Sequence, residues 1–571
     1  YNDLEAAAEY AESFAALSGK IMDSSKNLAE AVSLYKACNM KVEKAFVYSH
    51  MRKDEDNGNS KYQEMYNKAV SVITDVSAKM SFFVPELLSH SEELLEQYIS
   101  EDQSLNEASF MLRQIFLEKP HTLSSEQEFI LASLGDALRA PDDIFTALND
   151  VDMTFGTVLN DDGNEVAVTH ASYAPLMESS NRDVRKATYD ALYEKYKEHN
   201  NTLASIYNSN VKTSVVRYKL RNYESCLDAA LSGNQIPKSV YTGLIEAVNS
   251  YLPSMHKYVE IRKRVLGVDE LKMYDIYKPL LKPANIEYTY EEAVKCACDA
   301  LSPMGEEYVT VLRKGLLEDK WVDIYENKGK TSGAYSFGSY DSFPYILLNF
   351  TGELRDVFTI IHEGGHSMHS YYTRKTQPYL YGDHCIFTAE VASTVNETLL
   401  IKHLLKNCDD SDLRAYLVNF YLEEFKGTVF RQTMFAEFEL KAHETVENGG
   451  SLTAEYLNSM YDELNTKYFG PALSHDDLIQ YEWSRIPHFY RDYYVYQYAT
   501  GYSAANAIAN RILSEGDTAR DEYIEFLKSG SSDYPIELLK IAGVDMSTTE
   551  PIISALNTFA ELVDELDAIM Q

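Results

Sequence analysis

The sequence predicts a mainly α-helical protein with a small β-sheet. Apolar residues recur at helical spacing through most of the chain, with charged residues between them, as in residues 4–16, 28–51 and 61–83. Hydrophobic residues make up 45% of the 571 residues, which excludes a largely disordered chain. This length exceeds the roughly 250–300 residues that one hydrophobic core usually organises, so we expect two or three sub-domains.

Two short segments break the helical pattern and predict β-structure. The β-rich runs 153–159 and 165–169 flank a turn that contains Asp-Gly, which is typical of a hairpin. A second β-like segment is formed by residues 333–336 and 345–349. The helical pattern resumes at Leu354 and continues almost to the end of the chain.

The pattern divides the chain into three consecutive regions. Residues 1–105 are predicted to form an N-terminal helical region, and residues 106–190 a helical region that contains the hairpin. Residues 191–571 form the predicted catalytic domain, because they hold the motifs described below. The sequence contains no internal repeat and no low-complexity linker.

Charge and cysteine usage restrict the partners and the compartment. The formal net charge of -36 repels nucleic-acid phosphates and anionic lipid surfaces, so we expect neither as a partner. The sequence contains no run of 18 apolar residues, so we expect no membrane span. The acidic, helical start is unlike a secretory signal. The six cysteines include no C-x-x-C pair, which in so large a chain indicates reduced thiols and a cytoplasmic protein. The oligomeric state is not indicated.

One motif carries metal chemistry. Residues 362–366 read His-Glu-Gly-Gly-His, the H-E-x-x-H pattern. His362 and His366 stand one turn apart on one helix face and can bind a single zinc ion, whereas Glu363 can take a proton from a metal-bound water. Each of the two glycines weakens a helix by about 1 kcal/mol relative to alanine, which suggests close approach of another helix or of the substrate. The alternative is two histidines on an ordinary buried helix.

A third ligand must follow the second histidine. The metzincin pattern is excluded, because its glycine and third-histidine positions hold His369 and Tyr372. The remaining common option is a glutamate from a following helix, and residues 387–397 read as such a helix. We assign Glu390 as the ligand and Glu397, on the same face, as a hydrogen-bond acceptor for a ligand histidine; the alternative is two surface carboxylates. His369 lies close to the face of the ligand histidines, so it could contact the substrate, support a ligand or simply be packed.

An aromatic segment near the C-terminus offers hydrogen-bond donors. Residues 487–502 hold several tyrosines and one histidine, and such donors can stabilise the oxyanion that forms during peptide hydrolysis. Tyr493 and Tyr496 are three residues apart and can share a helix face, and His488 lies close in sequence. For most of these tyrosines the alternative is an aromatic core stripe.

These motifs resemble oligoendopeptidase F, which belongs to the thimet oligopeptidase family of zinc metallopeptidases. The resemblance is carried by residues 362–369 and 387–394, by the tyrosine segment 487–501 and by the strand 345–349. It spans most of the chain, although residues 1–105 are only generically similar. It implies a two-lobed helical metallopeptidase with a deep central channel, a small β-sheet near the active site and one zinc ion per chain at the channel floor.

The resemblance also implies a role for each motif residue. The metal ligands of the family are matched by His362, His366 and Glu390. Its catalytic glutamate is matched by Glu363. Its transition-state donors are matched by His488, Tyr496 and Tyr493. The strand edge that pairs with the substrate backbone is matched by Gly333, Ala334 and Tyr335.

The predicted function is that of a zinc-dependent endopeptidase. It would hydrolyse internal bonds of short unstructured peptides, with a zinc-bound water activated by Glu363 as the nucleophile. The narrow channel that the resemblance implies would exclude folded proteins. Two alternatives stay open: a metallocarboxypeptidase or dipeptidase on a related helical scaffold, and a catalytically silent helical peptide-binding protein. A structural zinc site is disfavoured, because such sites usually fill all four positions with Cys and His.

Overall fold

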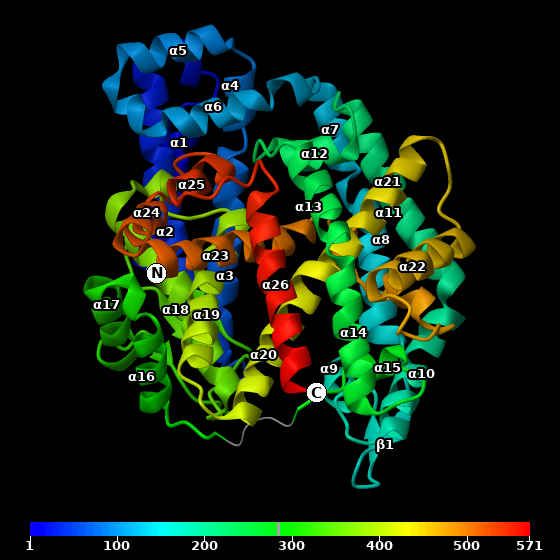
Figure 1. Ribbon diagram of the computed structural model, residues 1–571. Coiled ribbons are helices and arrows are strands. Elements are labelled where there is room, and N and C mark those ends of the chain that lie inside the picture. The colour runs from blue at the N-terminus through cyan, green and yellow to red at the C-terminus, as the bar shows by residue number, and fades with distance from the viewer. Residues whose placement is uncertain (282–285) are drawn as a thin grey trace. The chain divides into compact units, whose positions relative to one another are not determined.

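The computed structural model describes residues 1–281 and 286–571, and within them the chain is mostly helical (Figure 1). The only regular β-structure in this described part is a two-stranded and a three-stranded sheet, which confirms the mainly α prediction. In the same residues no helix is both long and apolar enough to cross a membrane. All six cysteines are free thiols.

The chain divides into two compact units, each assembled from segments that are far apart in the sequence. The first unit comprises Tyr1–Thr122, Asn285–Leu404 and Ala505–Asp545, and the second comprises Leu123–Ala284, Leu405–Ala504 and Met546–Gln571. Two of the points at which the chain passes from one unit to the other lie inside helices, α19 (Ile386–Lys406) and α23 (Tyr496–Glu515). The three consecutive regions predicted from the sequence describe a different division, along the chain, and they stay a prediction.

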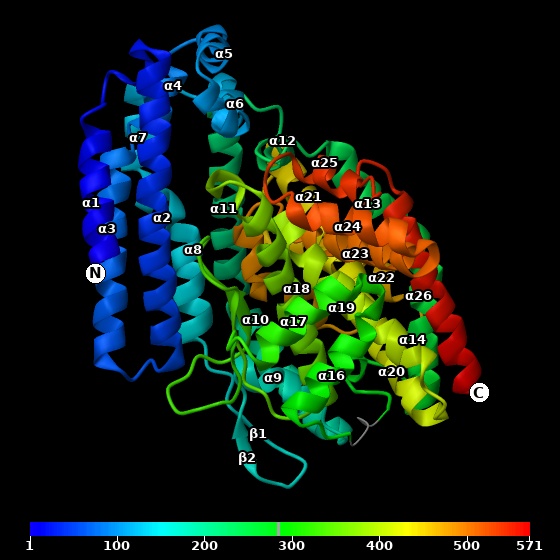
Figure 2. The ribbon, with the colours of Figure 1, turned by 90° about the vertical axis from the view of Figure 1, so that its left-hand side faces the viewer.

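The first unit begins with three long helices that run side by side (Figure 2). Ser24 caps the second of them by accepting the backbone N–H of Asn27. Phe14 and Phe83 meet edge to face at 5.6 Å in the core that these helices share with the next ones. The helices before the sheet are α1 (Asn2–Ala15), α2 (Ser25–Glu55), α3 (Ser60–Met80), α4 (Phe83–Leu88), α5 (Glu92–Glu101), α6 (Ser109–Leu117), α16 (Tyr290–Ala300) and α17 (Glu306–Leu317). The helices after it are α18 (Leu354–Thr376), most of α19, the end of α23, α24 (Asp517–Lys528) and α25 (Pro535–Ile541).

A three-stranded sheet precedes α18; the sequence predicted two of its strands, and the third, at residues 322–323, was not predicted. Its strands are β3 (Val322–Asp323), β4 (Tyr335–Phe337) and β5 (Tyr345–Leu347), in the order β3-β5-β4. The central strand β5 pairs in parallel with β3 and antiparallel with β4, with Ser336 opposite Ile346. Since β4 is at the end of this order, one of its edges has no partner among the described strands.

The second unit holds the predicted hairpin and a core rich in tyrosine. Strand β1 (Thr157–Leu159) pairs antiparallel with β2 (Glu165–Ala167), which confirms the hairpin (Figure 2). Some buried tyrosine hydroxyls in this unit find polar partners, as where Tyr241 donates to the Ala436 carbonyl at 2.8 Å. Its first helices are α7 (Ser125–Ser133), α8 (Gly135–Thr146), α9 (His170–Met177), α10 (Arg182–Glu198), α11 (Asn200–Leu220), α12 (Cys226–Ser232), α13 (Lys238–Ser250), α14 (Leu252–Leu266) and α15 (Met273–Ile276). They are followed by α20 (Ser411–Phe425), α21 (Arg431–Glu447), α22 (Ala454–Phe469), the start of α23, and α26 (Glu550–Ile569), which lies beside α14 (Figure 1).

Candidate metal centre

Helix α18 presents both motif histidines on one side because its opposite side is buried. Val357, Ile361 and Met368 are fully buried, which fixes the rotation of the helix about its axis. The start of the helix is also fixed, since the Asp356 carboxylate accepts the backbone N–H groups of three preceding residues, Thr351, Gly352 and Glu353. The histidines of the motif therefore project from a rigid element.

Three predicted ligands converge in the first unit. Nε2 of His362 and Nε2 of His366 lie 3.2 Å apart. Oε2 of Glu390, from α19, lies 3.4 Å from the first of these nitrogens and 3.5 Å from the second. In the described part of the chain these three form the one group of His, Cys, Asp or Glu side chains with the spacing of a metal site.

The spacing of these atoms fits one tetrahedral metal ion. Bonds of about 2.0–2.2 Å to nitrogen and carboxylate oxygen in a tetrahedron place the ligand atoms about 3.3–3.6 Å apart. Two of the three separations in this site, 3.4 and 3.5 Å, lie within that range, and the third, 3.2 Å, lies about 0.1 Å below it. Two imidazoles and one carboxylate also leave the fourth position open, as catalytic metal sites do.

Second-sphere contacts orient the ligands. Oε1 of Glu397 accepts a hydrogen bond from Nδ1 of His362 at 3.1 Å, which leaves Nε2 of that ring free to bind a metal. Ser393 Oγ donates to Oε2 of Glu390 at 3.1 Å. Asn396 Nδ2 donates to the Ile361 carbonyl at 3.1 Å and thereby joins α19 to α18 beside the ligands. The geometry thus brings Glu397 to the place expected of it.

Carboxylates and imidazoles in this cluster shift one another's protonation. Burial acts to lower the pKa of His362, but the hydrogen bond that its Nδ1 donates to Glu397 and the neighbouring carboxylates outweigh burial and raise the pKa to about 9. Burial acts to raise the pKa of Glu390, yet the two histidines hold it at about 2. The buried imidazoles and carboxylates of the cluster thus interact strongly with one another, as expected of side chains that can surround a cation.

Glu363 lies beside the ligands without joining them. Its side chain is 7% exposed and lines the same cavity as the two histidines. Burial raises the pKa of its carboxyl, and the backbone of Ser336 in β4 offers it a hydrogen bond. A carboxylate with a raised pKa, held against the edge of a strand, is suited to accept and return a proton.

Comparison with known proteins identifies the family. Residues 175–558 match the family described as Peptidase family M3, and residues 86–155 match the one described as Oligopeptidase F. The chain belongs to peptidase family M3. It is therefore a metallopeptidase, as the H-E-x-x-H motif indicated.

Relatives of this M3 peptidase are similar along nearly its whole length. Oligopeptidase PepF of Bacillus subtilis is 46% identical over 568 residues, which cover 100% of this chain and 85% of that protein. A solved structure described as a putative peptidase from Chlamydophila abortus aligns with a TM-score of 0.91 at 40% identity and covers 96% of this chain and 92% of that one. Oligoendopeptidase-F from Enterococcus faecium aligns with a TM-score of 0.79 at 39% identity and covers 100% of this chain and 98% of that one.

A cavity of about 870 Å³ in the first unit of the M3 peptidase contains the metal centre. Its walls come from α2, β4, α18 and the segment before α19. Ala334 and Tyr335, two of the predicted substrate-binding residues, line it beside the unpaired edge of β4. Gly333 lies just outside it, where its carbonyl accepts a hydrogen bond from Asn349 at 2.8 Å, and lines a smaller hollow.

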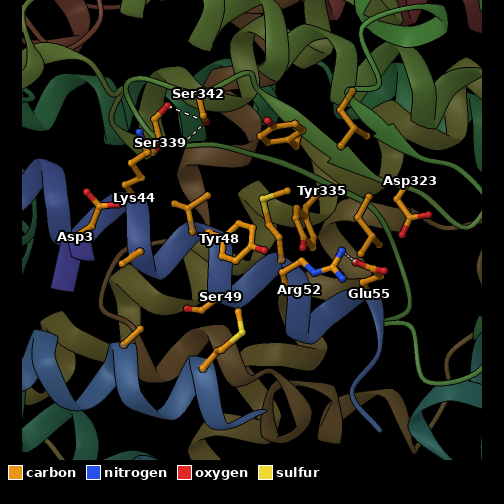
Figure 3. A pocket seen from close by; sticks show the side chains of 18 of the residues that line it. Asp3, Lys44, Tyr48, Ser49, Arg52, Glu55, Asp323, Tyr335, Ser339 and Ser342 are labelled. Atoms are coloured by element: carbon orange, nitrogen blue, oxygen red, sulfur yellow. Dashed lines mark hydrogen bonds and ion pairs between the residues drawn. The ribbon is translucent and has the colours of Figure 1, made fainter. Parts of the chain in front are cut away.

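A second cavity of the first unit lies between α2, α3 and the small sheet (Figure 3). It has a volume of about 840 Å³ and shares Val47 and Tyr335 with the catalytic cavity. Tyr335 donates through its hydroxyl to Oδ2 of Asp54 in α2 at 3.2 Å. The side chain of Tyr335 thus ties the edge strand to α2.

His369 does not fit the predicted contact with substrate. Its side chain is 1% exposed and stacks on His384 at 4.1 Å between ring centroids, with Phe526 of α24 on it at 5.4 Å. Burial holds the pKa of His369 well below its usual value, so the ring is neutral. His369 is turned into the core because it lies about 60° around the helix axis from His366.

The three predicted transition-state donors belong to the second unit. His488 accepts or donates a hydrogen bond with the Tyr498 hydroxyl at 3.4 Å, whereas Tyr493 and Tyr496 are each 2% exposed. Tyr493 has a positive φ of 54°, and its backbone N–H donates to Oε1 of Glu439 at 2.6 Å. Their role toward the metal centre stays a prediction.

A buried cluster that no sequence motif indicated holds this tyrosine segment. Glu439 is buried, which raises the pKa of its carboxyl to about 8, and its acceptance of the Tyr493 N–H fixes the strained residue. His443 contacts Oδ1 of Asp492 through Nε2 at 3.2 Å and packs on the Tyr493 ring at 4.8 Å. The available signal was the four-residue spacing of Glu439 and His443, which places both on one face of their helix.

Proposed function

We propose that this M3 peptidase is a zinc endopeptidase that hydrolyses internal bonds of short, unstructured peptides. The observation that carries the proposal is the arrangement of four side chains in one cavity. Nε2 of His362, Nε2 of His366 and Oε2 of Glu390 have the spacing of a three-ligand site, and Glu363 lines the cavity beside them. This is the combination that metal-assisted peptide hydrolysis requires.

Zinc is the metal that the ligand set favours, since two imidazoles and one carboxylate form the His₂Glu set of catalytic zinc sites. When bound, a zinc ion lowers the pKa of a water ligand to about 7 and polarises the carbonyl that is attacked. Manganese or cobalt could replace it, because the same ligands bind those ions less selectively.

Glu363 moves the protons. Its carboxylate takes a proton from the attacking water and then gives it to the amine that leaves. The raised pKa of this buried carboxyl supports both steps, because a group that is too acidic would not hold the proton between them. The hydrogen bond offered by the Ser336 backbone keeps the carboxylate at the edge of β4.

The unpaired edge of β4 is the proposed binding site for the substrate backbone. An extended peptide can add to such an edge through main-chain hydrogen bonds, which bind any sequence. Ala334 and Tyr335 face the cavity at this edge, and Ser336 links it to Glu363. A peptide held there would have its carbonyl groups close to the metal ligands.

His488, Tyr493 and Tyr496 are the proposed donors to the negative charge that develops on the carbonyl oxygen. The O–H group of a phenol and the N–H group of an imidazole are suitable donors. A single donor commonly raises kcat by a factor of about 10²–10³. The fixed conformation of Tyr493 at positive φ supports a functional role for this segment, because strain of this kind clusters at active sites.

The relatives support the class of substrate. The names oligopeptidase and oligoendopeptidase, borne by proteins 42–46% identical to this one, indicate short peptides and internal cleavage. The formal charge of -36 agrees with the expectation that neither nucleic acid nor an anionic membrane is a partner. A cytoplasmic location stays a prediction from the cysteine pattern.

An internally quenched peptide of about ten residues, blocked at both ends, tests the proposal. Cleavage that a zinc chelator abolishes and added zinc restores would support a zinc endopeptidase. If only peptides with a free end are cut, the enzyme is an exopeptidase. If several peptide sequences stay intact after zinc is added, the chain is a binding protein instead.

A further inference from the structure

Four residues form a row along α18 that faces the catalytic cavity. The two motif histidines are followed at the same spacing by Ser370 and Arg374, and all four line the cavity. Residues four apart on a helix lie nearly above one another, with a rise of about 6 Å per step. The row therefore leads from the metal ligands to a guanidinium group about 12 Å further along the helix axis.

Arg374 is the one Lys or Arg among the described residues that line this cavity. The other charged residues around it are acidic: Glu43, Glu363, Asp383 and Glu390. A single cation in such surroundings would usually be engaged in an ion pair. The described part of the chain offers Arg374 no carboxylate within ion-pair distance, and its Nε and Nη1 have no hydrogen-bond partner there.

The two nearest carboxyl groups do not neutralise this cation. Burial raises the pKa of Glu43, which also accepts hydrogen bonds from the Tyr340 backbone and from Tyr379. The side chain of Asp383 is 88% exposed, so water screens its charge. Burial acts to lower the pKa of Arg374 and outweighs the opposite effect of both carboxyl groups.

The guanidinium stands at the end of the substrate-pairing edge. Nη2 of Arg374 donates to the Gly338 carbonyl at 2.9 Å, and Gly338 directly follows β4. A β-carbon on Gly338 would lie 2.9 Å from Nη1, so glycine leaves room for the guanidinium. Gly338 is two residues beyond Ser336, whose backbone contacts Glu363, which corresponds to about 7 Å of extended chain.

We propose that Arg374 forms a carboxylate-binding subsite of the catalytic cavity, where it holds an anionic group of the peptide about two to four residues from the bond that is cut. The group is either the C-terminal carboxylate or the side chain of Asp or Glu. The subsite sets where a peptide is cut relative to that carboxylate. This inference rests on the proposed function, because it assumes that the cavity binds peptides.

Matched peptides test the subsite. One peptide sequence is prepared with a free C-terminal carboxylate and with a C-terminal amide, and cleavage is followed by mass spectrometry. We expect the wild-type enzyme to cut the acid with a kcat/KM about 10–100-fold above that of the amide, as for a hydrogen-bonded charge. Amidated peptides that carry a single Glu at successive positions then show whether a side-chain carboxylate restores the rate.

Substitutions of Arg374 assign the effect. In Arg374→Gln the kcat/KM for the acid peptide is expected to fall to that for the amide, while the value for the amide stays the same. Arg374→Lys should keep part of the difference because it keeps the charge. Lys375→Gln is the matched control: it removes a charge from the same helix, at a side chain that is 54% exposed and does not line the cavity. Circular dichroism reports whether each variant is folded. If Arg374→Gln does not fold, the acid and amide peptides are compared in Arg374→Lys instead.

A binding measurement separates this inference from the proposed function. Fluorescence anisotropy with labelled acid and amide peptides is measured on Glu363→Gln, which is expected not to turn over, and on the double variant Glu363→Gln/Arg374→Gln. Tighter binding of the acid that the second substitution abolishes supports the subsite even if the wild-type enzyme cuts neither peptide. The subsite would be overturned if Glu363→Gln bound the acid and the amide equally and the wild-type enzyme cut them equally. The peptidase function would still stand.

Discussion

Gly365 of α18 lies directly against Ser393 of α19, so close that a β-carbon on Gly365 would be 2.6 Å from Cα of Ser393. The same atom would be 2.7 Å from the Ala392 carbonyl oxygen. Ser393 in turn bonds the third predicted ligand, Glu390. The absence of a side chain at Gly365 therefore allows the two ligand-bearing helices to approach, as the glycine pair in the sequence suggested.

The first prediction concerns this contact. Gly365→Ala should force α19 away from α18 and weaken metal binding at least 10-fold, because the carboxylate of Glu390 moves with its helix. Gly364→Ala is the control, since its β-carbon meets only the flexible end of Leu312, at 3.1 Å. Zinc titration followed by a competing chromophoric chelator measures both. Equal affinity in the two variants would show that the helices adapt to the added methyl group.

The second prediction tests the proton carrier. Glu363→Gln should lower kcat by about 10²–10⁴-fold, since the amide cannot accept a proton. The metal content should not change, because Glu363 lies beside the ligands and is not one of them. Peptide cleavage and metal analysis of the same sample decide it. Full activity with full metal occupancy would exclude Glu363 as the proton carrier.

The third prediction concerns the partner of His362. Glu397→Gln should weaken metal affinity about 10–100-fold, because the carboxylate that accepts the Nδ1 proton orients the ring. Glu291→Gln, at an exposed position in α16 that does not line the cavity, removes the same charge and should leave affinity unchanged. Isothermal titration with zinc compares them. If zinc affinity changes by the same small factor in both variants, the cause is the loss of net charge and not the orientation of the His362 ring.

The fourth prediction is a pH dependence of stability in the second unit. Asp275 has a fully buried side chain that receives Arg182 Nη2 at 2.7 Å and Arg185 Nη2 at 2.8 Å. Burial acts to raise the pKa of Asp275, but these hydrogen bonds lower it below its usual value. The stabilisation is therefore complete above the unfolded-state pKa of about 3.9 and is lost as the pH falls through the lower, folded-state pKa.

Asp275→Asn should accordingly reduce the free energy of unfolding by about 3–5 kcal/mol at neutral pH. The difference from wild type should begin to shrink below about pH 4, where the carboxyl of the unfolded wild-type chain takes up a proton, and should disappear once the pH lies below the lower, folded-state pKa. Asp299→Asn, which breaks an exposed pair with Lys295, should change stability by no more than about 1 kcal/mol. Urea unfolding in the presence of a chelator measures all three proteins without a contribution from the metal. A difference independent of pH would assign the effect to packing.

The fifth prediction concerns the proposed donors. Tyr496→Phe should lower kcat by about 10²–10³-fold with KM nearly unchanged, because a hydrogen bond made only in the transition state is lost. Tyr494→Phe removes a hydroxyl two residues away and should have little effect. Steady-state kinetics on one peptide compares the two variants. A rise in KM at constant kcat would indicate substrate binding by Tyr496 instead.

Local sequence rules accounted for the elements that depend on neighbours in the chain. The positions of His362 and His366 on one face of α18 follow from the 3.6-residue helical period, and the hairpin β1-β2 follows from its turn. Glu390 and Glu397 were assigned from the spacing on the next helix, and the structure brings both to His362. Each of these assignments needs at most the geometry of one helix or one turn.

The sequence by itself thus determined the helical class, the motif and the residues able to hold a metal, because period and spacing act within a single element. Only the tertiary structure decided which neighbours of the motif reach the cavity. His369 is buried because His384 and Phe526 cover it, whereas Arg374, which has no pattern of its own, lines the cavity beside the end of β4. The reason is physical: burial and hydrogen bonding are decided by residues more than a hundred positions away as well as nearby ones, and no local rule contains them.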